Sequence, residues 1–222
     1  MKKVGIVGIG GVASYAQIPA YIEKGIRIQA ICDINEEILN KIGDKYNISN
    51  RYTDIEEMIV KEKVDIIDVA TPPQTHLDII RIANKYNVEV IMQKPLIVDI
   101  KEFEQLKELI NANKHLKLNL TGRYVSAWQK IKKILNNKEI GKPLIGDNDI
   151  RTWKLPRPGQ KLPVESLENN WFIDSFGCAM ADYLDYFNKN EKELEDKEYA
   201  IELTKLTFKV SEATKSNKWI EI

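Results

Sequence analysis

The sequence has few of the residues that build disulfide frameworks or metal centres. It contains two cysteines, Cys32 and Cys178, and two histidines in 222 residues. Two widely separated cysteines make no disulfide framework, and there is neither a Cys-x-x-Cys pair nor a histidine cluster to suggest a metal. We therefore expect no metal site, and we expect a reducing, cytoplasmic setting.

Excess charge of one sign and long apolar runs are also absent. The 33 Lys and Arg residues balance 33 Asp and Glu residues, so the basic footprint that nucleic-acid binding usually leaves is missing. No apolar run reaches the ~20 residues that span a bilayer, and the N-terminus does not read as a signal peptide. Hydrophobic residues are 43% of the chain, which is ordinary for a globular protein. We expect neither nucleic acid nor membrane as a partner.

The first half of the sequence alternates between short apolar runs and amphipathic segments. The predicted strands are residues 4–7, 28–32, 64–70, 88–92 and 116–120. The predicted helices between them are residues 12–22, 34–42, 76–86 and 99–109. Nearly continuous apolar strands that alternate with helices are typical of a parallel sheet covered on both faces. The sequence therefore predicts an α/β fold with a doubly wound parallel sheet.

The pattern changes after residue 122. Further helices are predicted at 128–135, 172–187 and 200–214, with a strand at 144–153. We divide the chain into a dinucleotide-binding domain, residues 1–121, and a reduced α+β domain, residues 122–222. The C-terminal helix of the second domain is expected to pack back on the first.

A glycine-rich turn follows the first predicted strand. Gly8, Gly10 and Ala13 form a G-x-G-x-x-A element. Gly8 permits the tight turn, Gly10 lets the backbone approach a pyrophosphate, and Ala13 lets the helix pack closely on the strand. The phosphates would lie at the helix N-terminus, beside Gly11 and Val12.

An acidic residue ends the second predicted strand. Asp33 follows Gly8 by 25 residues, where a carboxylate would accept hydrogen bonds from a ribose diol. The same carboxylate repels a 2′-phosphate, which favours NAD over NADP. A methyltransferase that binds S-adenosylmethionine also places an acid after its second strand, and this alternative stays open here.

Two later strand ends carry further candidate residues, because ligands of open α/β sheets bind outside the carboxyl ends of the strands. Thr71 and Pro72 form a stiff loop that could wall the cleft, and His76 begins the next helix, where we expect it to bond nearby backbone. Gln93 and Lys94 precede a proline, so a cis peptide bond is open there. A lysine at a buried strand end that faces a cleft suits proton transfer; a surface lysine is the alternative.

These motifs, in this order, resemble the Gfo/Idh/MocA family of glucose–fructose oxidoreductase and inositol dehydrogenase-like enzymes. The matching elements are Gly8-x-Gly10-x-x-Ala13, Asp33, Thr71-Pro72-Pro73-x-x-His76, Gln93-Lys94-Pro95, Arg123-Tyr124 and Ile140-Gly141-Lys142-Pro143. The resemblance implies a Rossmann domain and an NAD(P)-dependent oxidoreductase. Such enzymes move a hydride between nicotinamide and a sugar-like or other hydroxyl or carbonyl substrate.

The resemblance also implies roles for individual residues. Lys94 stands at the family's catalytic or substrate-orienting lysine, with Tyr124 or Asp174 as helpers. Cofactor contacts are implied for Gly8, Gly10, Gly11, Val12, Ala13, Asp33, Thr71, Pro72, His76, Gln93 and Lys94.

Three departures from the family pattern leave two readings open. Gln93 replaces a glutamate, and Ser175 and Ala179 stand where the family carries an Asp and His proton-relay pair. The sequence after residue 122 is also too short for the family's large second-domain sheet. One reading is an oxidoreductase with a shortened C-terminal domain. The other is a non-catalytic NAD(H)-binding sensor, or a partner subunit of a larger enzyme, and homo-oligomers are compatible with either reading.

Overall fold

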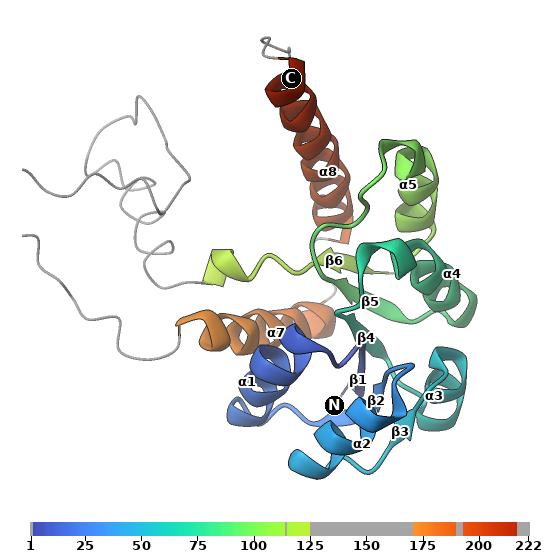
Figure 1. The fold of residues 1–222 in the computed structure, drawn as a ribbon, viewed down its shortest axis with the longest axis vertical. Coiled ribbons are helices and arrows are strands. Elements are labelled where there is room, and N and C mark those ends of the chain that lie inside the picture. The colour runs from blue at the N-terminus through green and yellow to red at the C-terminus, as the bar shows by residue number, and fades with distance from the viewer. Residues whose placement is uncertain (1, 114, 125–170, 190–192, 217–222) are drawn as a thin grey trace, which may run out of the picture.

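A computed structural model describes residues 2–113, 115–124, 171–189 and 193–216 (Figure 1). The strands in these ranges are β1 (Val4–Val7), β2 (Ile28–Cys32), β3 (Arg51–Tyr52), β4 (Ile66–Val69), β5 (Glu89–Met92) and β6 (Leu116–Leu118). The α-helices are α1 (Ile18–Glu23), α2 (Glu36–Lys45), α3 (Ile55–Glu62), α4 (His76–Tyr86), α5 (Phe103–Ala112), α7 (Trp171–Lys189) and α8 (Glu193–Ser216). Short helical turns are η1 (Ala13–Gln17), η2 (Pro73–Thr75), η3 (Ile100–Glu102) and η4 (Thr121–Tyr124).

The strands form one parallel sheet in the order β3-β2-β1-β4-β5-β6. This is the doubly wound order, in which the chain reverses direction across the sheet between β1 and β4. The predicted α/β fold with a doubly wound parallel sheet is confirmed. The reversal point places the carboxyl ends of β1 and β4 side by side, and that is where such sheets bind ligands.

Helices cover both faces of the sheet (Figure 1). One core cluster joins α1, α2 and α7 to the sheet, and the other joins α3, α4, α5 and the first turns of α8. Because both faces are covered, β1, β4 and β5 are buried along their whole lengths. This explains why their sequences read as continuous apolar runs, with Asp68 and Glu89 as the ionisable exceptions.

Close packing brings the two C-terminal helices onto the first half of the chain. Helices α7 and α1 lie so close at Gly177 that a Cβ on this residue would lie 2.9 Å from the carbonyl oxygen of Ala20. Ala200 and Ile201 on α8 are buried against the sheet, where α8 contacts β6 and α5. The division of the chain at residue 122 stays a prediction, and the segments predicted at 128–135, 140–143 and 144–153 lie outside the described residues.

Candidate functional site

The glycine turn packs between the carboxyl ends of β2 and β4. Gly8 has a φ of 80°, a left-handed conformation that side chains disfavour, and its N–H donates to the carbonyl oxygen of Cys32 at 2.8 Å. A Cβ at position 8 would lie 2.7 Å from Thr71 Cγ2 and 2.9 Å from the Thr71 nitrogen. Only glycine therefore fits at this point.

The next two glycines face open space. A Cβ on Gly10 or Gly11 would meet nothing within 4 Å, and both residues are exposed. The Ser14 N–H donates to the Gly10 carbonyl at 2.9 Å and begins the helix, so the amides before it are N-terminal donors without helical partners. Ala13 is fully buried and lets this helix lie against the sheet. Open space, N-terminal amides and small residues together make a cradle that fits a pyrophosphate.

Asp33 is fixed beside this turn by backbone amides. Its Oδ2 accepts from the Ile9 N–H at 2.9 Å, and its Oδ1 accepts from the Asn35 N–H at 2.9 Å. Each carboxylate oxygen can accept a second hydrogen bond, as a ribose diol requires. Arg51 on the neighbouring β3 directs its guanidinium to Asp44 at 2.7 Å, so it is engaged away from Asp33. This arrangement suits a free 2′-hydroxyl better than a 2′-phosphate.

His76 ties the loop after β4 to the loop after β5. Its Nε2 lies 3.0 Å from the carbonyl oxygen of Thr71, and its Nδ1 lies 3.0 Å from that of Leu96. The ring is fully buried, and this burial lowers the pKa of His76. Neither ring nitrogen is left for a cofactor, so the geometry makes His76 a positioning residue for the loop of Thr71 and Pro72.

Gln93 and Lys94 stand at the carboxyl end of β5, next to the loop of Thr71. The Gln93 N–H donates to the Val69 carbonyl at 3.0 Å, while its side-chain Nε2 is buried and has no hydrogen-bond partner among the described residues. The Lys94–Pro95 peptide bond is cis. The Lys94 side chain is exposed, because its loop lies beyond the last strand residue.

Tyr124 belongs to a polar cluster at the end of β6. Its hydroxyl donates to Asp182 Oδ2 at 2.7 Å, and its ring meets Tyr183 edge-on at a centroid distance of 6.4 Å. The Lys117 ammonium lies 3.7 Å from the same Asp182 oxygen and 4.2 Å from the centroid of the Tyr183 ring. Asp174 lies on α7, but its side chain is outside the described residues. Sequence reasoning missed the Tyr124–Asp182 bond, since it joins residues 58 positions apart.

The two positions of the family's relay pair lie in the buried face of α7. Ser175 and Ala179 are 2% and 1% exposed, and Gly177 on the same helix packs against α1. Neither side chain carries an ionisable group. A proton relay of the usual kind is therefore absent at these two positions.

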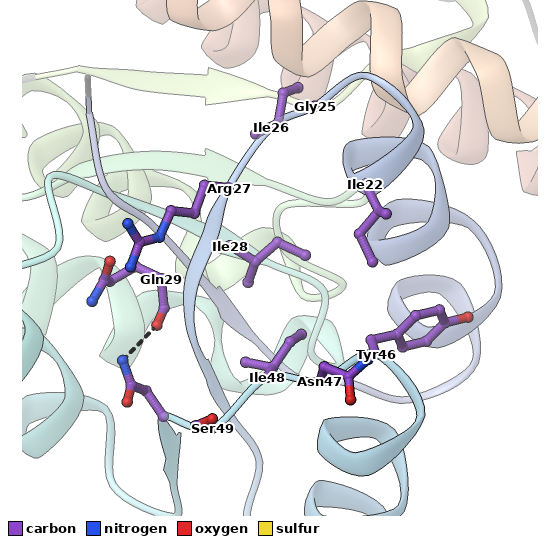
Figure 2. A pocket seen from close by; sticks show the side chains of 11 residues that line it. Ile22, Gly25, Ile26, Arg27, Ile28, Gln29, Tyr46, Asn47, Ile48 and Ser49 are labelled. Atoms are coloured by element: carbon purple, nitrogen blue, oxygen red, sulfur yellow. Dashed lines mark hydrogen bonds between the residues drawn. The ribbon is translucent and has the colours of Figure 1, made fainter.

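Two surface pockets lie at the amino ends of the strands, whereas the glycine turn lies at their carboxyl ends. One, of about 480 Å³, sits at the start of β2 between the ends of α1 and α2, where Ile22, Ile28, Tyr46 and Ile48 line it (Figure 2). The other, of about 490 Å³, lies beside Lys2. Neither belongs to the candidate site, because both are at the amino ends of the strands.

Comparisons with known proteins agree with this geometry. Residues 2–119 match the Gfo/Idh/MocA oxidoreductase family with an NAD-binding Rossmann fold, and the chain belongs to that family. It is 29% identical over 130 residues to D-apiose dehydrogenase of Rhizobium rhizogenes, which covers 58% of this chain and 38% of that protein. It is also 29% identical over 147 residues to inositol 2-dehydrogenase of Salmonella typhimurium, which covers 64% of this chain and 44% of that one.

Solved structures show the same fold. An oxidoreductase from Agrobacterium radiobacter, solved with NAD+, L-tartaric acid and magnesium, has a TM-score of 0.59 and 29% identity over 64% of this chain and 42% of its own. Scyllo-inositol dehydrogenase from Lactobacillus casei, with NAD(H) and scyllo-inositol, has a TM-score of 0.56 at 22% identity, covering 64% and 43%. The predicted family and the family cofactor, NAD, are confirmed, and the methyltransferase alternative is set aside.

The chain spans about two fifths of the length of these curated relatives. Among the described residues, no group of His, Cys, Asp and Glu side chains could hold a metal ion. No helix in the described ranges has the length and apolar character needed to cross a membrane.

Proposed function

We propose that this chain is an NAD-dependent oxidoreductase that acts on a small sugar-like or related hydroxyl or carbonyl substrate. One observation carries the proposal. The glycine turn after β1, Asp33 after β2 and the Thr71 loop after β4 lie together at the carboxyl ends of the strands, and Lys94 follows β5, the strand that pairs with β4. The relatives named as inositol and apiose dehydrogenases support the substrate class.

The residues present fit NAD at three points. The open backbone at Gly10 and Gly11 leaves room for phosphates, and Asp33 keeps acceptor capacity for a ribose diol. The buried, unpaired Nε2 of Gln93 is a donor without a partner in the described part of the chain. A buried donor without a partner is costly, so an acceptor on the bound cofactor would stabilise it.

Lys94 has the chemistry that alcohol oxidation requires of the protein. Bound NAD supplies the hydride acceptor or donor. Lys94, exposed at the end of β5, would orient the substrate oxygen and take or return its proton. Tyr124 and Asp174 are the helper residues that we propose, and Asp182 holds the Tyr124 hydroxyl in one orientation.

A second candidate is a non-catalytic NAD(H)-binding protein, either a sensor or a partner subunit of a larger enzyme. Ser175 and Ala179 favour it, because they put no ionisable group at the relay positions. We further propose that residues 1–121 form the cofactor-binding domain and residues 122–222 a reduced second domain.

Turnover distinguishes the two candidates. A panel of cyclitols and aldopentoses is incubated with NAD, and the reverse reaction is run with the matching ketones or lactones and NADH. Lys94→Ala should lower the turnover rate by about 10²–10⁴-fold while NAD still binds, and Lys101→Ala, which changes an exposed lysine on η3, serves as the control. NAD binding without turnover on any substrate would favour the second candidate.

A further inference from the structure

The strand β4 carries a fully buried carboxyl group that the proposed chemistry does not use. Asp68 is 0% exposed and pairs in register with Ile6 on β1 and Ile91 on β5. Its Oδ2 accepts from Gln17 Nε2 at 2.9 Å and from the Tyr21 hydroxyl, and both donors are buried as well. The result is a closed polar cluster in an otherwise apolar layer.

The helix that this cluster anchors is the one that begins at the glycine turn. Gln17 is the last residue of the π-helical turn η1, which starts at Ala13. Tyr21 lies one turn further, on α1. π-Helical turns carry an extra residue and often occur at functional sites. Asp68 therefore fixes the helix whose N-terminus makes the phosphate cradle.

Two oxygens of the cluster lack partners when the carboxyl is ionised. Asp68 Oδ1 and Gln17 Oε1 are both buried, and neither has a hydrogen-bond partner in the part of the chain that the structure describes. A proton on Asp68 would supply the missing donor, because a carboxylic acid and a primary amide can pair through two hydrogen bonds. The existing Gln17 Nε2 bond to Oδ2 is one of those two.

Among the residues that the structure describes, none places a cation against an ionised Asp68. Its strand neighbours on the same face, Ile6 and Ile91, are apolar, and Tyr21 is the titratable group that bonds to it from α1. From α7, Tyr183 lies near Tyr21, and the Lys117 ammonium lies over the Tyr183 ring and 3.7 Å from Asp182 Oδ2. Burial accordingly raises the pKa of Asp68 to about 7, although the bonds from Tyr21 and Gln17 act in the opposite direction.

We infer that Asp68 is a positioning residue of the dinucleotide site, and that NAD binds more tightly when Asp68 is protonated. This inference rests on the proposed NAD binding. A bound dinucleotide brings two negative phosphates to the helix that Asp68 anchors. A further negative charge on the buried Asp68 is then disfavoured, so binding takes up a proton. By linkage, the affinity for NAD falls as the pH rises through the Asp68 titration.

Calorimetric titration of NAD at pH 6 and pH 8, in buffers of different ionisation enthalpy, tests this inference. The wild-type chain should take up a proton near neutral pH, and its Kd should rise about fivefold or more between the two pH values. Asp68→Asn keeps the size of the side chain but cannot titrate, so its Kd should not change with pH. Asp65→Asn is the control, since it removes an exposed carboxyl three residues away. Tyr21→Phe removes a bond to the ionised form, so it should move the midpoint to higher pH.

Failure of the inference differs from failure of the proposed function. The absence of NAD binding at every pH would sink the proposed function, and the inference with it. NAD binding with a Kd that is independent of pH, or a pH dependence that Asp68→Asn retains, would overturn the inference alone. The carboxyl carbon-13 resonance of Asp68 in the free wild-type chain gives a test without any variant. An inflection near pH 7 supports the inference, and an ordinary acidic midpoint overturns it.

Discussion

Gly8 and Thr71 lie so close together that no side chain fits between them. A Cβ at position 8 would sit 2.9 Å from the backbone nitrogen of Thr71, which cannot swing away as a side chain can. The contact joins the turn after β1 to the loop after β4, across the point where the strand order reverses. The shape of the cofactor-binding turn thus depends on the absence of a Cβ at Gly8.

Gly8→Ala should destabilise the chain and weaken NAD binding together. The φ of 80° and the clash with Thr71 lead us to expect a loss of about 1–3 kcal/mol in the free energy of unfolding. Gly10→Ala is the matched comparison, because a Cβ there meets open space. It should leave the unfolding free energy within about 0.5 kcal/mol of wild type, yet still weaken NAD binding by occupying the phosphate approach. Urea unfolding and calorimetry measure the two effects, and equal stability losses in both variants would contradict this account.

Lys94→Ala should separate chemistry from cofactor binding. Loss of a proton-transfer group typically lowers the turnover rate by about 10²–10⁴-fold. The Kd for NAD should change little, because the glycine turn and Asp33 remain intact. Steady-state rates on any substrate found in the screen provide the measurement. Turnover equal to wild type would show that Lys94 plays no part in the chemistry.

His76→Ala should loosen the two loops that the ring joins. The neutral ring carries one N–H, so one of the carbonyl oxygens of Thr71 and Leu96 would lose its donor and both loops would lose the buried ring between them, which should lower the free energy of unfolding by about 1–3 kcal/mol. The lowered pKa of His76 has a further consequence. The unfolded chain takes up the proton first, so wild-type stability should fall as the pH drops below 6.5. Thermal melts from pH 7 to pH 5 measure how stability changes with pH in the wild type and in His76→Ala. The variant should lose the part of this pH dependence that comes from His76. An unchanged pH dependence would contradict a buried, neutral His76 ring.

Asp68 should give a slope of the opposite sign. Its pKa is raised from 3.8 to about 7 in the folded chain, so the folded state holds the proton more tightly between those two values. Stability should therefore fall as the pH rises through this window and level off above about pH 7, by roughly 4 kcal/mol at most. Asp68→Asn removes this slope, whereas the exposed Asp65→Asn leaves it. His76 titrates in both variants, so its contribution cancels in the comparison. Identical pH dependence in the two variants would refute the raised pKa.

The parallel sheet could be predicted because buried strands have a local signature. The runs at 4–7 and 88–92 are apolar and bounded by turn residues, and both are strands in the structure. By contrast, β3 escaped prediction, because Arg51 and Tyr52 are only half-buried and make no apolar run. Helix α3 was not predicted either, although its sequence carries a signal for the start of a helix. Asp54 caps α3 by accepting a hydrogen bond from the Glu57 N–H at 2.7 Å, which is the first half of a capping box.

Some residues of the candidate site could likewise be predicted from the sequence, and others could not. The glycine turn and Asp33 are recognisable because their spacing along the chain fixes their chemistry. The cluster around Asp68 is not, since its partner Gln17 lies 51 residues away and a lone aspartate in an apolar strand does not name its partner. His76 was expected to bond nearby backbone. Its bond to Leu96, from the next strand's loop, depends on how two loops meet and not on local sequence.

The most direct test of the central claim is a calorimetric titration of the wild-type chain and Asp33→Ala with NAD and NADP. We predict that NAD binds the wild type, that NADP binds at least about tenfold more weakly, and that Asp33→Ala loses most of the NAD affinity, because the ribose loses its acceptor and the Ile9 and Asn35 amides lose theirs. NAD affinity that Asp33→Ala leaves unchanged, or no binding of either dinucleotide, would contradict the account.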